Sequence, residues 1–387
     1  FRHIYNSFNW WKAFVVNAEG ERKEMPMLYI GERFGSETVH KDCEADIVLS
    51  AFENDHSIVD PESEGGVIVA VGYSERQKLF NSPDMYCVKA IVGNKYKGAG
   101  VNITHGITKN LKLMAEKALK DKNEEITPQN IDDEIHKMKI VALDRLRHKK
   151  LIETINNLGA EVILVKEDDL TPTFAVTRGE IDMIIGVGGV PEAVLSGIIV
   201  AQLGGEMTLR VLPYEVALEE HLLGQLKHWD SFKKNEIDIL RNFKIVRPGT
   251  EKAGEIPWDR TLTLEDLVKG KDIVFTASVI KKTPWIKLSD GEEVPGVNIN
   301  PESGDINVFV VRVADNNVEI VPIVYKTVIG NLLEQYKANQ DANCEANVRL
   351  LVQLGKVYSE FGLFEEARDC IQKAKICNGI SDDMIQR

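Results

Sequence analysis

A glycine-rich turn between an apolar strand and an apolar helix is the feature that most restricts the fold of this chain. The short apolar run Met183–Gly186 leads into Gly188 and Gly189, and Glu192–Leu203 then forms a long apolar segment of helical length. Glycine allows the backbone to approach a ligand closely, and the amide groups at the start of a helix favour anions. The pattern therefore predicts a ligand-facing turn within an α/β fold.

Strands and helices alternate around this turn. From Lys139 onward, the apolar run Ile140–Leu143 is followed by a basic helix over 145–158, the strand Val162–Val165, a loop of acids and the strand that enters the turn. This order predicts a sheet with crossover helices. Three further strands are expected at 273–276, 308–313 and 318–323.

The N-terminal part, from Phe14 to about Gly100, is rich in short apolar runs. Strands are expected at 13–16, 46–49 and 66–72, and a helix at 110–122. The charged stretch 120–139 is typical of a solvated insertion. The segment 1–8 reads as the middle of a helix without a cap, so we expect residues upstream of Phe1.

Composition excludes several classes of protein. The chain has 387 residues with 43% hydrophobic and 28% charged, which allows a sizeable core. Its net charge of −13 argues against nucleic-acid binding, and no apolar run approaches the roughly 20 residues of a membrane span. The five cysteines contain no CxxC pair, which indicates reduced thiols. We expect a cytoplasmic location or the lumen of an organelle.

The chain becomes helical after about Asn339. Six positions in 354–367 resemble a tetratricopeptide repeat: Leu354, Gly355, Tyr358, Gly362, Phe364 and Ala367. One repeat cannot bury its own faces, so it would dock on the preceding domain or precede further repeats. The pattern predicts protein partners, and the alternative is an ordinary helical hairpin.

Several motifs occur in one order along the chain. They are Glu19–Glu21, Pro26–Glu32, Asn81–Tyr86, Arg147–His148, the turn Gly186–Glu192 and Leu203–Met207. Together they resemble the class II fructose-1,6-bisphosphatase family, which includes fructose-/sedoheptulose-bisphosphatases, over about residues 8–336. The resemblance implies the lithium-sensitive sugar-phosphatase fold, an α/β (α+β layered) fold of two sheet-plus-helix halves, and assembly as a homo- or hetero-oligomer.

The resemblance also implies metal-assisted hydrolysis with Mg²⁺ or Mn²⁺. Its metal carboxylates fall on Glu19, Glu53 and Glu192, and its catalytic positions on Glu19, Glu53 and Asp55. Ser50 stands where the family motif has an Asp, and a hydroxyl is a poorer ligand than a carboxylate for a hard dication. If this centre is lost, the protein would carry no cofactor.

Two further departures surround the expected reaction centre. The family's Gly-Thr after the motif glutamate is replaced by Asn54 and Asp55, and an aspartate there would repel phosphate. Val279 replaces a flexible glycine in a run that otherwise resembles the family pattern.

The sugar-phosphate side is better preserved. The resemblance places substrate contacts on Tyr86, Arg145, Arg147, His148, Glu167, Asp169, Gly188 and Gly189. The basic residues would bind phosphate through charge-assisted hydrogen bonds, and the acids would contact sugar hydroxyls. Each residue alone is equally typical of a core position, a helix face or a loop, so the order of the motifs carries the prediction.

Three functions follow from these patterns. The first is a catalytically impaired paralogue that serves as a structural or regulatory subunit of a larger assembly. The second is an active bisphosphatase that removes the 1-phosphate, with Asp55 or the upstream carboxylate replacing the missing ligand. The third is a sensor that binds a sugar phosphate without cleaving it. The expected domains are 1–138 (metal-site half), 139–338 (C-terminal α/β half) and 339–387 (helical extension).

Overall fold

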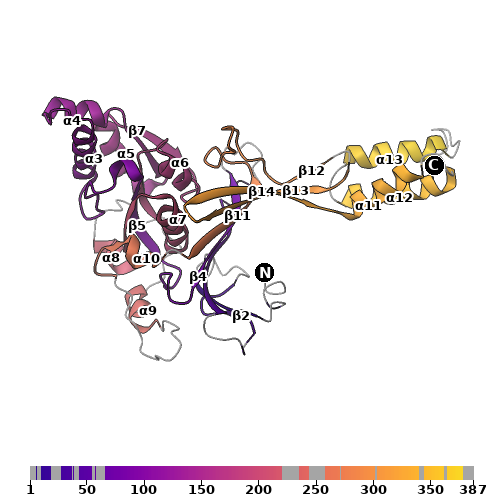
Figure 1. Ribbon diagram of the computed structural model, residues 1–387, viewed down its shortest axis with the longest axis horizontal. Coiled ribbons are helices and arrows are strands. Elements are labelled where there is room, and N and C mark those ends of the chain that lie inside the picture. The colour runs from indigo at the N-terminus through magenta and orange to yellow at the C-terminus, as the bar shows by residue number, and fades with distance from the viewer. Residues whose placement is uncertain are drawn as a thin grey trace. The chain divides into compact units, whose positions relative to one another are not determined.

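The computed structural model describes residues 10–18, 28–36, 43–54, 66–219, 235–243, 258–270, 272–300, 303–339, 344–360 and 364–377, with the single residues 6, 38 and 57. The chain forms two compact units. The first comprises Phe1–Val294 with Val310–Ile320, and the second comprises Pro295–Phe309 with Val321–Arg387 (Figure 1). The three-part division expected from the sequence stays a prediction.

The first sheet is mixed and contains the strands in the order β12-β13-β11-β4-β3-β1-β2, with β14 paired to β13. β1 runs parallel to β3 and antiparallel to β2, and β4 is antiparallel to both β3 and β11. The strands are β1 (Lys12–Ala18), β2 (Arg33–Gly35), β3 (Glu44–Glu53), β4 (Val67–Glu75), β11 (Ile273–Lys281), β12 (Asn298–Ile299), β13 (Ile306–Ala314) and β14 (Asn317–Tyr325).

The second sheet is also mixed and has the order β10-β9-β5-β8-β6-β7. β6 is parallel to β7 and β8, as expected for crossover connections, whereas β5 is antiparallel to β8 and β9. The strands are β5 (Tyr86–Val92), β6 (Lys139–Leu143), β7 (Glu161–Val165), β8 (Met183–Gly189), β9 (Glu206–Val211) and β10 (Leu262–Thr263). Every strand expected from the sequence overlaps one of the observed strands, so these predictions are confirmed.

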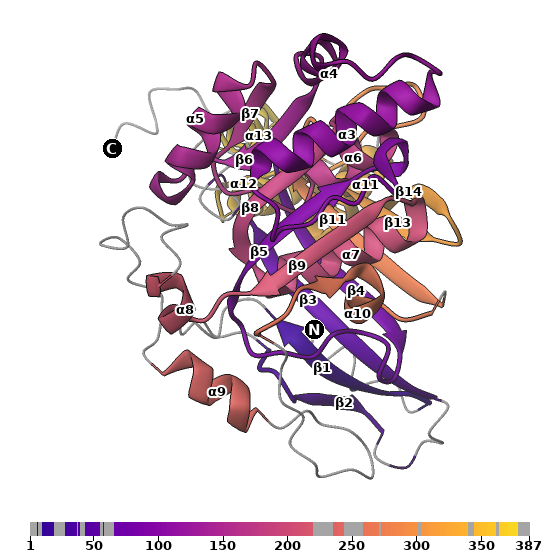
Figure 2. The same cartoon turned by 90° about the vertical axis from the view of Figure 1, so that its left-hand side faces the viewer.

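Helix α7 (Val190–Leu203) lies between the two sheets and contacts strands of both (Figure 2). Nearly all of its side chains are buried, because it is apolar on every side. The neighbouring strand approaches it closely: a Cβ at Gly72 of β4 would lie 2.3 Å from Ile198 Cδ1. Helix α6 (Pro172–Arg178) packs beside α7 and against β5 and β8.

Three helices pack around a separate core of the second sheet. They are α3 (Ile107–Asp121), α4 (Pro128–Ile135) and α5 (Lys149–Asn157). The expectation of a solvated insertion over 120–139 is wrong for this part, because Thr127 caps α4 and Ile135 and Met138 are buried in the core. The remaining short helices are η2 (Asn94–Tyr96), η3 (Leu146–His148), α8 (Tyr214–Glu219), α9 (Glu236–Asn242) and α10 (Leu264–Leu267).

The second unit is dominated by α11 (Val328–Ala338), α12 (Cys344–Glu360) and α13 (Phe364–Cys377), which share one apolar core. Thr327 caps α11 by accepting a hydrogen bond from the Gly330 amide. The α12–α13 pair is close at Gly355, where a Cβ would lie 3.3 Å from the Ala367 carbonyl oxygen. Helices after residue 339 are therefore confirmed, whereas the tetratricopeptide repeat stays a prediction. Within the described ranges, no helix is both long and apolar enough to cross a membrane.

Candidate functional site

The glycine turn joins the end of β8 to the first turn of α7. Gly189 is the N-cap in an extended conformation, and Pro191 and Glu192 form the first turn. Neighbouring carboxylates leave no room for a Cβ at two adjacent positions of the turn, which explains why both are glycine. A Cβ at Gly188 would lie 1.8 Å from Asp169 Oδ2, and one at Gly189 would lie 2.0 Å from Glu192 Oε2. The turn is therefore shaped around two buried carboxylates.

Lys89 faces this turn from the middle of β5 and is buried. Its Nζ lies 2.7 Å from Asp169 Oδ2 and also donates a 3.2 Å hydrogen bond to the Asp169 carbonyl oxygen. Burial acts to lower the pKa of Lys89, but the carboxylates of Asp169 and Glu192 help to outweigh it and raise that pKa. Lys89 is therefore a fixed positive charge in the site. Lys89 was not predicted from the sequence, although a lone lysine within the apolar strand Tyr86–Val92 indicates a buried charge with a specific partner.

Asp168, next to the predicted contact Asp169, holds the loop that leads to α6. Its Oδ1 accepts a 2.8 Å hydrogen bond from the Thr171 amide, and its Oδ2 accepts one from the Thr171 hydroxyl. Thr171 also lies 3.2 Å, hydroxyl to hydroxyl, from Thr283. Burial raises the pKa of Asp168 to about 6. This network fixes the backbone that presents Asp169.

Arg147 and Tyr86 lie together beside the turn. The guanidinium of Arg147 donates a 2.9 Å hydrogen bond to the Val187 carbonyl oxygen and lies 5.6 Å from the centre of the Tyr86 ring. Burial lowers the pKa of Arg147, yet an arginine remains charged at any ordinary pH. A cation stacked near an aromatic ring and held at a glycine turn is suited to an anionic ligand.

His148 uses both ring nitrogens within the protein. Nδ1 lies 2.8 Å from the Leu143 carbonyl oxygen, and Nε2 accepts a 2.8 Å hydrogen bond from the Val187 amide. This pattern requires Nδ1 to carry the proton. Burial, reinforced by the charge of Arg147, lowers the pKa of His148 to about 4. The ring is therefore neutral at pH 7 and connects the end of β6 to β8 rather than offering a positive charge to phosphate.

Arg145 and Glu167 form an ion pair at a more exposed edge of the site. Arg145 Nη2 lies 2.8 Å from Glu167 Oε1, and both side chains are partly exposed. The two positions were predicted separately as a phosphate contact and a sugar contact. An exposed pair of this kind is weak, so a ligand could exchange for either partner.

Strand β3 carries Ser50 and Glu53 near its end, and Asn54 follows directly after it. Ser50 is fully buried, and its hydroxyl donates a 3.3 Å hydrogen bond to Glu53 Oε2 across an irregularity in the β3–β4 register. Asn54 has φ 66°, a left-handed conformation favoured by glycine and tolerated by asparagine. Its side-chain amide donates a 3.0 Å hydrogen bond to the Gly66 carbonyl oxygen. Asparagine thus forms the left-handed turn after β3, at a position where the resemblance predicts a glycine.

The predicted metal residues are only partly covered by the described structure. Glu19 and Asp55 lie outside the described residues. Glu53 and Glu192 are both buried, and α7, which carries Glu192, packs against β3, which carries Glu53. No group of three His, Cys, Asp or Glu side chains that could hold a metal ion occurs in the part of the chain described here. The predicted ligand set stays a prediction.

The described side chains thus comprise a buried lysine, a stacked arginine and several acids around a glycine turn at a helix start. Residues of these types bind phosphate and hydroxyl groups in many proteins, and they lie here in a mixed α/β fold. Residues 2–324 match the family of bacterial fructose-1,6-bisphosphatases encoded by glpX, and the chain belongs to this family.

Curated relatives agree with this assignment. The fructose-1,6-bisphosphatase class 2 of Haemophilus influenzae is 27% identical over 281 residues, covering 71% of this chain and 73% of the relative. The D-fructose 1,6-bisphosphatase class 2/sedoheptulose 1,7-bisphosphatase of Trichodesmium erythraeum is 27% identical over 322 residues, covering 80% and 82%. The protein of the same name from Microcystis aeruginosa is 28% identical over 274 residues, covering 68% and 70%.

Proposed function

We propose that this protein binds a sugar phosphate but hydrolyses it poorly, and that it serves as a structural or regulatory member of a larger assembly. The observation that carries the proposal is the hydrogen bond from Ser50 to Glu53. A hydroxyl stands at the position of the family's aspartate, and it occupies an oxygen of the neighbouring carboxylate. Ser50 and Glu53 together carry one negative charge, whereas the aspartate and glutamate of the family pattern carry two.

Ligand binding is supported by the residues around the turn. Arg147 is held by the Val187 carbonyl oxygen with its charge beside the Tyr86 ring, which suits a phosphate group. Asp169 is fixed by Lys89 and can accept hydrogen bonds from sugar hydroxyls. Arg145 and Glu167 add a second, more exposed pair. His148 is assigned a positioning role, because both of its ring nitrogens are engaged.

A divalent ion bound in a phosphatase polarises the phosphoryl group and lowers the pKa of a bound water. The described donors do not fit Mg²⁺ or Mn²⁺ well, because Glu53 and Glu192 are the predicted metal carboxylates that the described residues include, and Ser50 supplies a hydroxyl bonded to Glu53 in place of a further carboxylate. We therefore derive no reaction step through the ion. Among the described donors the mismatch is the hydroxyl of Ser50, and Asn54 beside it adopts the left-handed conformation that a glycine would adopt readily.

The alternative function is an active fructose-1,6-/sedoheptulose-1,7-bisphosphatase. It is favoured by the retention of Glu53 and Glu192 as buried carboxylates at the ends of two packed elements. It requires Glu19 and Asp55 to complete the ligand set. The relatives carry both activities in their names, so both substrates should be tried.

Two measurements on the full chain separate these functions. Calorimetry with fructose 6-phosphate should show saturable binding that Arg147→Met abolishes, whereas Arg178→Met, which alters an exposed arginine paired with Glu180, should leave it unchanged. Phosphate release from fructose 1,6-bisphosphate or sedoheptulose 1,7-bisphosphate with Mn²⁺ should not exceed release with EDTA. Absence of binding would reject ligand recognition, and EDTA-sensitive release would establish the alternative.

A further inference from the structure

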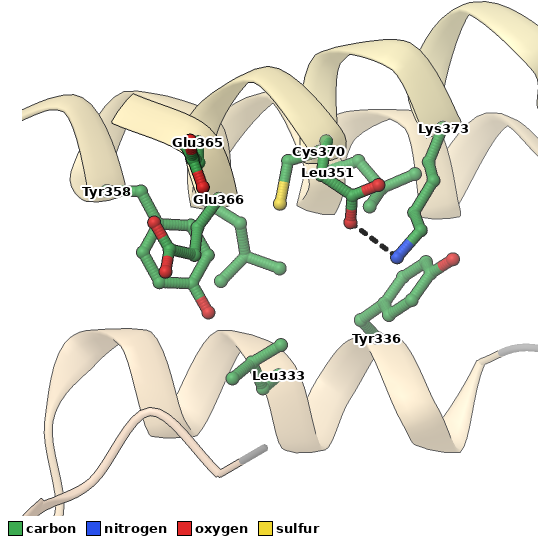
Figure 3. Close-up of a pocket in the computed structure, with 10 residues that line it drawn as sticks. Leu333, Tyr336, Leu351, Tyr358, Glu365, Glu366, Cys370 and Lys373 are labelled. Atoms are coloured by element: carbon green, nitrogen blue, oxygen red, sulfur yellow. Dashed lines mark ion pairs between the residues drawn. The ribbon is translucent and has the colours of Figure 1, made fainter. Parts of the chain in front are cut away.

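The second unit contains an open groove of about 370 Å³ between its helices. Figure 3 shows α11 on one side of the groove and α13 on the other. Helix α12 packs against both and supplies the floor. All of the lining residues belong to the second unit, so the groove is a feature of that unit alone.

The floor of the groove is apolar. Leu351 and Leu354 of α12 are almost completely buried in the unit's core and present part of their surface to the groove, with Tyr358 one turn further on. Leu333 and Tyr336 of α11 are half-buried and form the opposite wall. Binding of an apolar side chain on this floor is favourable, because it removes apolar surface from water.

The rim of the groove on α13 is acidic. Glu365, Glu366 and Asp369 line it, and the one basic lining residue, Lys373, is held by Asp369 at 2.6 Å. A dashed line in Figure 3 marks this ion pair. Both of its partners are more than half exposed. Such an exposed pair is weak, because solvent screens both charges. A cation of a binding partner could therefore replace Lys373 at Asp369 with little loss of interaction energy.

We propose that this groove binds a partner segment in which one or two large apolar side chains are flanked by lysine or arginine. The apolar floor would contact the apolar side chains of the partner, and the acidic rim would attract the basic residues on either side of them. A cavity of this volume accommodates one or two side chains, so the occupant is a short peptide segment rather than the face of a folded domain. The proposal deepens the assembly role proposed above by assigning it a surface and a partner chemistry, and it rests on that role.

The test uses the full chain and a fluorescein-labelled octapeptide, Lys-Lys-Gly-Leu-Trp-Gly-Lys-Lys, followed by fluorescence anisotropy. Two comparison peptides carry glutamate in place of every lysine, or serine in place of every leucine and tryptophan. Saturable binding is expected for the first peptide, with at least tenfold weaker binding of both comparison peptides. Higher salt should weaken the interaction, because the rim charges are exposed.

Variants locate the binding. The triple variant Glu365→Gln/Glu366→Gln/Asp369→Asn should lose at least tenfold in affinity, and Leu333→Ser should do the same from the opposite wall. The control Glu124→Gln/Glu125→Gln/Asp132→Asn removes three exposed acids from the first unit and should change affinity less than twofold. Circular dichroism would verify that every variant is folded.

Two results would overturn the proposal: no saturable binding to the unaltered protein, or equal losses in the rim variant and its control, which would indicate general charge attraction. The anisotropy measurements involve no sugar phosphate. Failure of the groove is therefore distinguishable from failure of the proposed ligand site, and restoration of phosphatase activity would leave this test unaffected.

Discussion

Lys89 Nζ lies 2.7 Å from Asp169 Oδ2, and both side chains are more than nine-tenths buried. The pair connects β5 to the loop before α6, and the carboxylate occupies the space that a side chain at Gly188 would need. One ion pair thus fixes a sugar-contact candidate, the shape of the glycine turn and a positive charge within the site.

Removing one partner of this pair should destabilise the folded protein. Lys89→Met leaves the Asp169 carboxylate buried and unpaired, which should lower the free energy of unfolding by about 3–5 kcal/mol. Urea denaturation would measure the loss. The control Lys117→Met, which breaks the exposed pair with Asp121, should cost less than about 1 kcal/mol. Equal effects in both variants would show that the buried pair has no special role.

Adding a methyl group at Gly188 should disturb the same carboxylate. In Gly188→Ala the new Cβ would lie 1.8 Å from Asp169 Oδ2, so the carboxylate must leave its position beside Lys89. We expect a loss of about 1–3 kcal/mol in stability and at least tenfold weaker binding of fructose 6-phosphate by calorimetry. Gly106→Ala, where no atom lies within 4 Å of the new Cβ, is the matched control and should bind as the unaltered protein does.

The neutral state of His148 should make stability depend on pH. Its pKa falls from 6.5 to about 4 on folding, so below pH 6.5 the unfolded chain binds a proton that the folded chain does not. Stability from this group is fully present above pH 6.5 and is lost as the pH falls toward 4, by at most about 3 kcal/mol. Urea denaturation at pH 5 and pH 7 should show a smaller difference for His148→Gln than for the unaltered protein. The exposed His136→Gln variant is the control, and an unchanged difference in His148→Gln would contradict the assignment.

Restoring the family's residues should restore a metal ligand. The triple variant Ser50→Asp/Asn54→Gly/Asp55→Thr places a carboxylate beside Glu53 in place of the donating hydroxyl. Calorimetry should show at least tenfold tighter Mn²⁺ binding, because hard cations prefer carboxylate oxygens. Without metal the two adjacent carboxylates should lower the melting temperature, and Mn²⁺ should raise it again. Ser50→Ala, which adds no carboxylate, is the control, and identical Mn²⁺ binding in all three proteins would refute the assignment.

Much of the fold follows from local patterns in the sequence. Apolar β-branched runs such as Ile140–Leu143 and Val162–Val165 mark the strands, and the glycine turn marks the start of α7. Helix α4 was missed because its buried face is short: Ile135 and the adjoining Met138 enter the core from an otherwise charged stretch. The number of charges in a segment therefore did not decide its burial.

The structure brings Arg147 and Asp169 to the glycine turn, while their role in substrate binding stays a prediction. The sequence alone did not show that His148 would be held on both sides by Leu143 and Val187. Lys89 was missed because its partner is eighty residues away in the chain, and only the tertiary packing of α6 and its preceding loop against β5 brings the two together. Tertiary hydrogen bonds of this kind leave no local periodicity in a sequence.

The most direct test of the account is phosphate release from fructose 1,6-bisphosphate by the full chain, measured with Mn²⁺ and again with EDTA. The same low release is expected under both conditions, because Ser50 supplies a hydroxyl where a metal-binding carboxylate is required. Release that depends on Mn²⁺ and is abolished by EDTA would contradict it and would show that Glu53 and Glu192 still contribute to a working metal centre.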